Sequence, residues 1–163
     1  MTTNEALELL LRSYVRYYDI YREEGVTEGF AAEAHFHSHD EQYFLVKTAK
    51  LAEADSHEYV FFAMADTLTP ETVESLVDKA WTAGTSRVQA TYTHHSSDVA
   101  LVILADTIAP EAVRPIKKAR RFASYKFGLH GFSHLRVIAF EPTSKKIVHN
   151  RMGDTLKKLF RNI

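Results

Sequence analysis

One nine-residue pattern occurs twice in the chain, and it constrains the fold more than any other feature. ADTLTPETV at residues 65–73 recurs as ADTIAPEAV at residues 105–113, an offset of forty residues. Each copy begins where an apolar run ends, YVFFAMA in the first case and VALVILA in the second. Each also carries a proline, Pro70 or Pro110, where a helix would begin and a missing N–H is tolerated. The repeat therefore predicts two strand–helix units of one kind.

The two copies differ in the helix that follows. The first predicts a helix over 70–83 that ends at Gly84. In the second copy Pro115 stands inside the turn that Ser75 occupies in the first, so we expect a kink or a late start. The apolar face of the first helix consists of Val73, Leu76, Val77, Ala80 and Trp81.

The elements of residues 58–141 run in the order β-α-β-β-α-β. RVQATYTHHSSDVALVILA (87–105) predicts a hairpin, and HLRVIAFEPTSKKIVHN (134–150) predicts another that turns at 142–145. This order resembles the ferredoxin-like architecture, in which the first and third strands are central. Those two strands are the fully apolar ones here, whereas the alternating 87–93 arm would lie at an edge. The expected fold class is α+β with a ferredoxin-like βαββαβ core, built on the repeat of 58–83 and 98–123.

We expect one α+β domain over 1–163. Residues 1–57 would form an N-terminal helical cover, residues 58–141 the core, and residues 142–163 a C-terminal hairpin arm and helix. The first helix would be capped by Asn4 and would stop at Gly25. Its apolar positions are Leu7, Leu10, Leu11, Tyr14, Val15, Tyr18 and Tyr21. A short helix over 154–161 would bury Leu156, Leu159 and Phe160.

The stretch EAHFHSHDEQYFL (33–45) has two interpretations. On a strand, His35, His37 and Glu41 would share one face, with a spacing that resembles the metal ligands of cupin barrels. As a helix start, Ser38 and Glu41 would form a capping box. We favour a helix over about 39–54, because a cupin needs short strands next and the following segments are helical. No metal site is therefore predicted, and these three residues are the weaker alternative.

Charge is distributed very unevenly along the chain. Residues 1–113 hold 7 Lys or Arg and 19 Asp or Glu, a net charge of −12. Residues 114–163 hold 13 Lys or Arg and 2 acids, a net charge of +11. Such an imbalance indicates an anionic partner for the basic part, or attraction between opposite ends of two molecules.

The basic run RPIKKARRFASYKFG (114–128) is the strongest candidate site. On a helix, Arg114 and Lys118 would share one stripe, and Lys117 and Arg121 would form the adjoining one. Aromatic residues interleave with these cations, the mixture expected where phosphates and exposed bases are held together. The alternative is a solvated basic face whose aromatic residues are core. An RRM-type reader is disfavoured, because VALVILA lacks the stacking aromatics of a third strand. The predicted anion-binding residues are Arg114, Lys117, Lys118, Arg121 and Lys126, with Arg151, Lys157, Lys158 and Arg161 adding to the basic face.

Two aspartates define the competing enzyme hypothesis. The strands of 58–65 and 99–105 should be adjacent and parallel. Asp66 and Asp106 follow them at equivalent positions, so their carboxylates should lie side by side at one sheet edge. They could hold a divalent cation, although each could equally satisfy only its own turn. In GFSH (131–134), Leu135 replaces the last glycine of a nucleophile elbow, so a serine hydrolase is disfavoured.

Several classes are excluded or disfavoured by composition. The chain has no cysteine, which excludes disulfides, thiolate zinc sites and cysteine nucleophiles. No apolar run approaches the ~20 residues that span a bilayer, and residues 1–25 do not resemble a signal peptide. We therefore expect a cytoplasmic binding module that needs no cofactor and holds nucleic acid or a phosphorylated metabolite on its basic face. The alternatives are the metal-dependent enzyme and a homo-oligomer whose acidic and basic surfaces meet.

Overall fold

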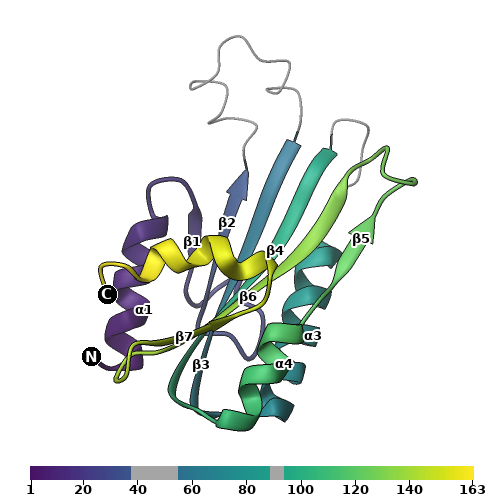
Figure 1. Ribbon diagram of the computed structural model, residues 1–163. Coiled ribbons are helices and arrows are strands. Elements are labelled where there is room, and N and C mark those ends of the chain that lie inside the picture. The colour runs from purple at the N-terminus through teal and green to yellow at the C-terminus, as the bar shows by residue number, and fades with distance from the viewer. Residues whose placement is uncertain (38–54, 89–93) are drawn as a thin grey trace.

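The structure, a computed structural model, describes residues 1–37, 55–88 and 94–163. Seven strands form one mixed sheet in the order β1-β2-β3-β4-β6-β5, and β7 also pairs with β6 (Figure 1). The strands are β1 (Asp19–Tyr21), β2 (Ala32–His37), β3 (Asp55–Leu68), β4 (His94–Ile108), β5 (Phe122–Ser124), β6 (Phe132–Glu141) and β7 (Lys146–His149). The helices are α1 (Thr3–Tyr14), α3 (Pro70–Ser86) and α4 (Val113–Lys118), with the 3-10 helices η2 (Pro110–Ala112) and η3 (Met152–Phe160).

The centre of the sheet is parallel, and the sequence repeat builds it. β3 and β4 are parallel neighbours in which Ala65 pairs with Ala105, which confirms the prediction for 58–65 and 99–105. β6 is parallel to β4 on its other side. α3 connects β3 to β4, and η2 with α4 begins the connection from β4 to β6. An apolar strand of this kind needs protein on both of its faces, as is usual in a parallel sheet.

The ferredoxin-like topology is not the one observed, because the strand order differs. That topology places the last strand antiparallel beside the first. Here β2 occupies that place beside β3, and β6 lies parallel on the far side of β4. Val88 is not in a strand, and the rest of the predicted 87–93 arm lies outside the described residues. β1 and β2 also show that residues 1–37 are not wholly a helical cover.

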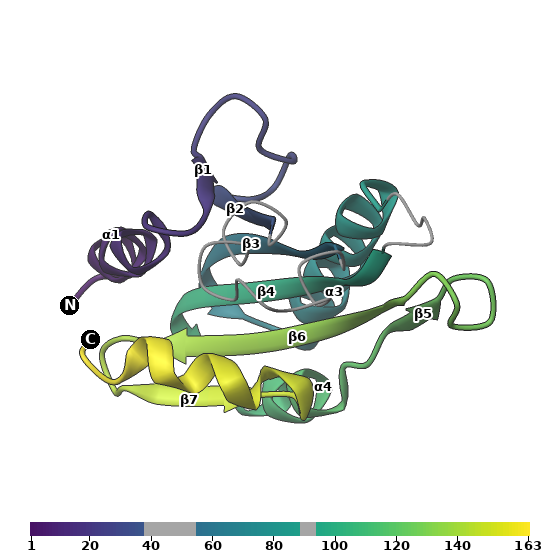
Figure 2. The same cartoon turned by 90° about the horizontal axis from the view of Figure 1, so that it is seen from above.

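Helices pack on both faces of the sheet and bury two separate cores. Figures 1 and 2 show α3 and α4 on one side, with α1 and η3 on the other. The neighbouring residues Phe61 and Phe62 on β3 point to opposite faces of the sheet, and each is buried in one of the two cores. Burial of a Phe side chain contributes roughly 1.5–3 kcal/mol to the free energy of folding. The first core joins α3 and α4 to Phe61, Leu101 and Val137. The second joins Leu10, Leu156 and Phe160 to Phe62, Val102 and Phe140.

The ends of the helices depart from expectation in several places. α1 is capped by Thr2, in a capping box with Glu5, rather than by Asn4, and it ends at Tyr14 rather than near Gly25. Gly84 lies inside α3 rather than at its end. The late start after Pro110 is confirmed, since a 3-10 turn precedes α4.

The C-terminal predictions are confirmed in their positions. β6 and β7 form the predicted hairpin, with its turn at 142–145. The last helix is η3, a 3-10 helix that buries Leu156 and Phe160. The helix predicted over 39–54, with Ser38 as its cap, lies outside the described residues.

Candidate functional site

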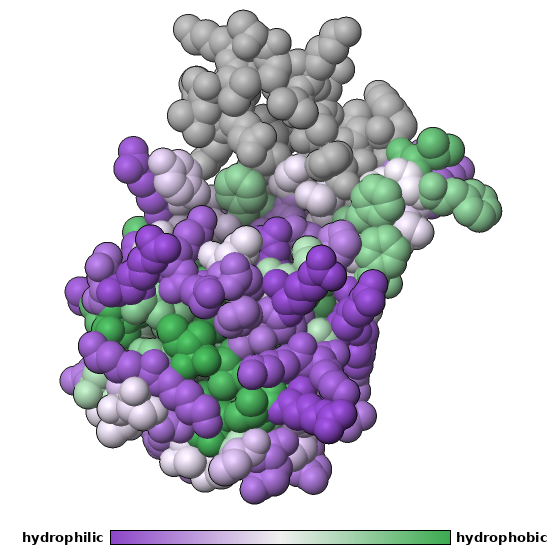
Figure 3. Space-filling model, viewed as in Figure 1, coloured by the Kyte–Doolittle hydropathy of each residue, from purple (hydrophilic) through white to green (hydrophobic). Residues whose placement is uncertain are grey.

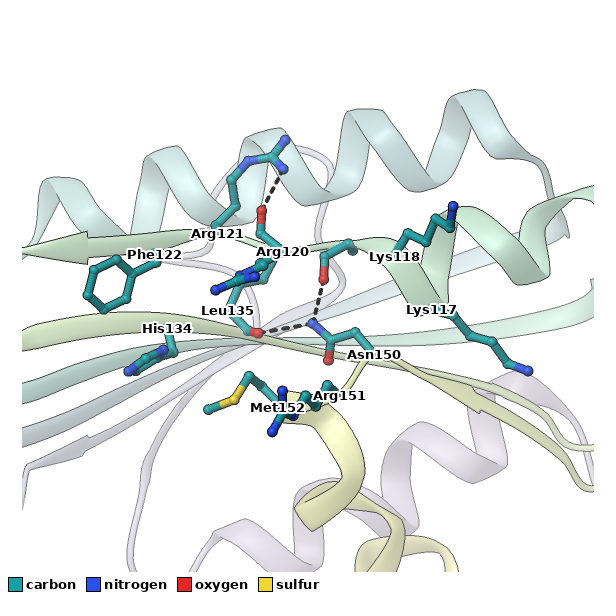
Figure 4. A pocket seen from close by; sticks show the side chains of 11 residues that line it. Lys117, Lys118, Arg120, Arg121, Phe122, His134, Leu135, Asn150, Arg151 and Met152 are labelled. Atoms are coloured by element: carbon teal, nitrogen blue, oxygen red, sulfur yellow. Dashed lines mark hydrogen bonds between the residues drawn. The ribbon is translucent and has the colours of Figure 1, made fainter.

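A cavity of about 400 Å³ lies between the end of α4, β5, β6 and the start of η3. Five cationic side chains line it: Lys117, Lys118, Arg120, Arg121 and Arg151. The remaining lining residues are Ala119, Phe122, His134, Leu135, Asn150 and Met152, and none of them is a carboxylate. In Figure 4 Lys117 and Lys118 lie on one side of Asn150, and Arg120, Phe122 and His134 lie on the other. The cavity is therefore strongly basic.

Asn150 holds the three walls of this cavity together. Its Nδ2 donates to the carbonyl oxygens of Ala119 and Leu135, at 2.9 and 3.0 Å (Figure 4). Its Oδ1 accepts from the backbone N–H groups of Val137 and Gly153, at 2.9 and 2.7 Å. All four bonds go to the backbone, so a buried amide fixes α4, β6 and η3 relative to one another.

The start of η3 also requires a glycine. A Cβ atom at Gly153 would collide with the carbonyl oxygen of Val137. This close approach brings Arg151 and Met152 against β6, where they line the cavity. The cavity wall therefore depends on backbone contact that only glycine permits.

Most of the cations around the cavity are not neutralised by other side chains. Arg121 is the exception, since its Nη2 lies 2.8 Å from Asp78 Oδ1 on α3. Within the described ranges, no ion pair involves Lys117, Lys118, Arg120 or Arg151. Residues 114–140 contain no Asp or Glu at all. The electrostatic potential at the cavity is thus positive.

The structure brings only part of the predicted anion site together. Lys117, Lys118 and Arg121 line the cavity, whereas Arg114 is exposed elsewhere on α4 and Lys126 lies in the β5–β6 loop. The prediction assumed a continuous helix, but α4 ends at Lys118 and Ala119 is extended. Arg120, His134 and Asn150 were missed as site residues. Asn150 bonds to the carbonyl oxygen of Ala119 only in the folded chain, because the two residues are 31 positions apart. No short sequence pattern therefore identifies Asn150 as a site residue.

Aromatic rings continue the cavity wall along the β5–β6 hairpin. The ring centroids of Phe122 and Phe132 are 5.8 Å apart with planes inclined by 28°. The imidazole of His134 lies 5.1 Å from the Phe122 ring. Ser133 faces the opposite side and is buried against Tyr125, whose hydroxyl lies 2.8 Å from its Oγ. Ser133 and His134 therefore do not form a nucleophile–base pair.

Asp66 and Asp106 occupy equivalent positions on β3 and β4, because the flanking residues Thr67 and Thr107 are paired. Both strands continue past these aspartates, and both side chains are exposed. Among the described residues, no three His, Cys, Asp or Glu side chains are placed to hold a metal ion. The enzyme hypothesis for this pair stays a prediction.

His35 belongs to a buried ionic cluster. Glu33 is fully buried on β2, and its Oε1 lies 2.6 Å from Arg87 Nη1 and 3.1 Å from His35 Nε2. Its Oε2 accepts from the backbone N–H of Thr27. Burial raises the pKa of Glu33, but the hydrogen bonds from His35, Arg87 and Thr27 outweigh it and hold the pKa at about 2. Glu41 lies outside the described residues, so the weaker alternative, a metal site of His35, His37 and Glu41, is not tested.

A second, partly buried ionic cluster lies on the opposite face of the sheet. The guanidinium of Arg136 on β6 bonds to Glu58 at 2.9 Å and to Asp98 at 2.8 Å. The Tyr18 hydroxyl donates to Glu58 at 2.9 Å. Burial raises the pKa of Glu58, and Arg136 opposes this shift. The cluster joins three parallel strands to the segment after α1.

The family of the chain follows from comparison with known proteins. Searches of curated proteins and of solved structures found no match to it. No helix within the described ranges has the length and hydrophobicity needed to cross a membrane. The family model "Domain of unknown function (DUF8052)" matches residues 2–162. Because this match includes nearly the whole sequence, the chain belongs to the DUF8052 family.

Proposed function

We propose that this protein is a non-catalytic binding module that holds a phosphate-bearing ligand in the basic cavity. The observation that carries the proposal is the lining of the cavity: five cations and no carboxylate surround a volume of about 400 Å³. Small-molecule sites in proteins have volumes of roughly 300–1,000 Å³. The cavity can therefore accept a phosphorylated metabolite or a few units of a nucleic acid backbone.

The arrangement of the cations suits phosphate rather than a single carboxylate. Lys117 and Lys118 come from the end of α4, whereas Arg151 comes from the segment before η3. Arginine binds phosphate oxygens through two N–H groups at once, and lysine supplies a mobile point charge. Cations that approach from separate segments can surround an anion with several oxygens.

Charge reversal at the cavity tests this function. We expect the double variant Arg120→Glu and Arg151→Glu to elute from heparin at clearly lower salt than the wild type. These two side chains are exposed and form no described ion pair, so the variant should stay folded. Arg121 is left unchanged because it bonds to Asp78.

The matched control makes the same change in charge away from the cavity. Arg12→Glu and Arg16→Glu remove two exposed arginines that do not line it. This control should elute close to the wild type, and the thermal unfolding midpoints of all three proteins should agree. Equal retention of the cavity variant and the wild type would contradict the proposed function.

A further inference from the structure

We propose that the ligand is single-stranded nucleic acid, whose phosphates lie in the basic cavity while its bases stack on Phe122 and Phe132. This inference rests on the proposed function and specifies its ligand. Phe122 connects the two parts, because it lines the cavity and also stacks with Phe132. A strand that leaves the cavity beside Phe122 therefore meets an aromatic surface at once.

The two rings are open to solvent, although they are large and apolar. Phe122 is 52% exposed and Phe132 is 39% exposed. They lie on the same side of β5 and β6, because Phe122 pairs with His134 and Ser124 pairs with Phe132. Their planes are inclined by only 28°, so the two stacked rings form one aromatic platform. Nucleobases stack on such aromatic side chains without strong sequence preference.

The hairpin that carries the platform is accessible. Figures 1 and 2 show the β5–β6 hairpin projecting away from α1 and η3. Figure 3 shows hydrophobic side chains gathered on this hairpin, at the upper right of the view. Its loop is tightly turned, with positive φ at Lys126, Phe127 and Gly128. The platform thus lies on two paired strands beside a compact loop.

Positive charge and exposed aromatic rings together favour nucleic acid over an acidic or neutral protein surface. The segment 114–140 carries Arg120 and Arg121 directly before the platform and Lys126 in the loop between its two rings. The same segment has no carboxylate to repel a phosphodiester chain. Alternating cations and exposed rings match a strand in which phosphates and bases alternate. In a duplex the base faces are already stacked, so a single strand is the form that fits.

The test compares ligands that differ only in their bases. Wild-type protein is titrated with a labelled oligothymidylate of about ten nucleotides, and with an abasic oligomer of equal length and charge. We expect the oligothymidylate to bind at least about fivefold more tightly, since one stacked base contributes about that factor. A duplex of the same length should bind more weakly than the single strand.

Matched variants show which rings cause the preference for oligothymidylate over the abasic oligomer. Phe122→Leu and Phe132→Leu remove the rings but keep apolar side chains at exposed positions, and each should bring the ratio of the two affinities towards one. Tyr17→Leu removes an exposed ring, 45% accessible, outside the platform and should leave the ratio unchanged. The comparison of ligands on the wild-type protein needs no variant, so a variant that unfolds does not remove the test.

Each other outcome has a definite meaning. Equal affinity for both oligomers, or for duplex and single strand, would overturn the inference while the proposed phosphate site survives. Loss of the base preference in Tyr17→Leu, with no loss in the platform variants, would place the bases elsewhere and overturn it too. No binding to either oligomer or to heparin would overturn both the inference and the proposed function.

Discussion

Glu33 is the one charged residue among those described that is buried. It is fully buried, yet its two oxygens accept hydrogen bonds from Arg87 and from the backbone of Thr27. Arg87 also lies over the rings of Tyr59 and Phe61, at 5.8 and 5.3 Å from their centroids. A buried charge of this kind is tolerated only when its partners are in place. The cluster therefore links the loop before β2, β2 itself and the end of α3.

This cluster should make stability depend on pH. The pKa of Glu33 is depressed from its ordinary 4.5 to about 2. Its contribution to folding is therefore present above about pH 4.5 and is lost as the pH falls towards 2, in total about 3 kcal/mol. Glu33→Gln should lower the free energy of unfolding by about that amount at neutral pH. The difference from the wild type should shrink on acidification below pH 4.5, as measured by urea unfolding at several pH values.

Glu8→Gln is the matched control for this measurement. Glu8 also bonds to an arginine, Arg22, but both side chains are half exposed. The solvent screens that pair, so we expect little change in stability. A constant difference between Glu33→Gln and the wild type at all pH values would show that the Glu33 charge is not stabilised as described.

At the scale of elements, the close packing of α3 on β4 depends on Gly84. A Cβ atom at this position would lie 2.5 Å from Val99 Cγ2, and Val99 is fully buried. In an exposed helix, replacement of glycine by alanine stabilises by about 1 kcal/mol. Here the clash should outweigh that gain, because a tightly packed core resists added volume.

We expect Gly84→Ala to lower the free energy of unfolding by about 1–2 kcal/mol. In the double variant with Val99→Ala, the added methyl group occupies the space that the valine leaves. The double variant should therefore be more stable than the sum of the single effects, by about 1 kcal/mol in chemical unfolding. A Gly84→Ala protein more stable than the wild type would mean that α3 has room at this position.

The sequence predicts the repeated units better than their surroundings. Two apolar runs, each followed by a proline-started helix, correctly indicate that β3 and β4 are parallel neighbours. The order of the outer strands carries no comparable signal. β6 is apolar on both faces from Leu135 to Phe140, with Arg136 as the exception, and fits either side of the central pair. Its place beside β4, like that of β2 beside β3, depends on tertiary contacts.

The ends of the helices are likewise hard to predict from the sequence. Thr2 and Asn4 are both good cap residues, and the choice of Thr2 depends on the reciprocal bond with Glu5. Gly84 resembles a helix stop in sequence, but it is required for close packing against Val99. Propensity alone cannot separate a glycine that ends a helix from one that permits close packing.

At the scale of the whole molecule, the fold gathers cations from the basic C-terminal part of the chain around one cavity. The basic C-terminal part supplies the end of α4, β5, β6 and η3, and the cavity forms where these elements meet. Charge composition therefore indicated four of the five cations that line the cavity, Lys117, Lys118, Arg121 and Arg151. It could not predict Arg120 or His134 as members, because β5 pairs with β6 only in the folded chain.

The central claim is that the basic cavity holds a phosphate-bearing ligand, and mapping of the contact residues by NMR tests it most directly. A proton–nitrogen correlation spectrum is recorded during titration with oligothymidylate at low salt, where electrostatic binding is strongest. The largest shifts should come from residues 117–122, 134–135 and 150–152, with little change at Glu33, Asp66 or Asp106. Largest shifts at the two aspartates, or no shift in the cavity residues at saturating ligand, would contradict the account.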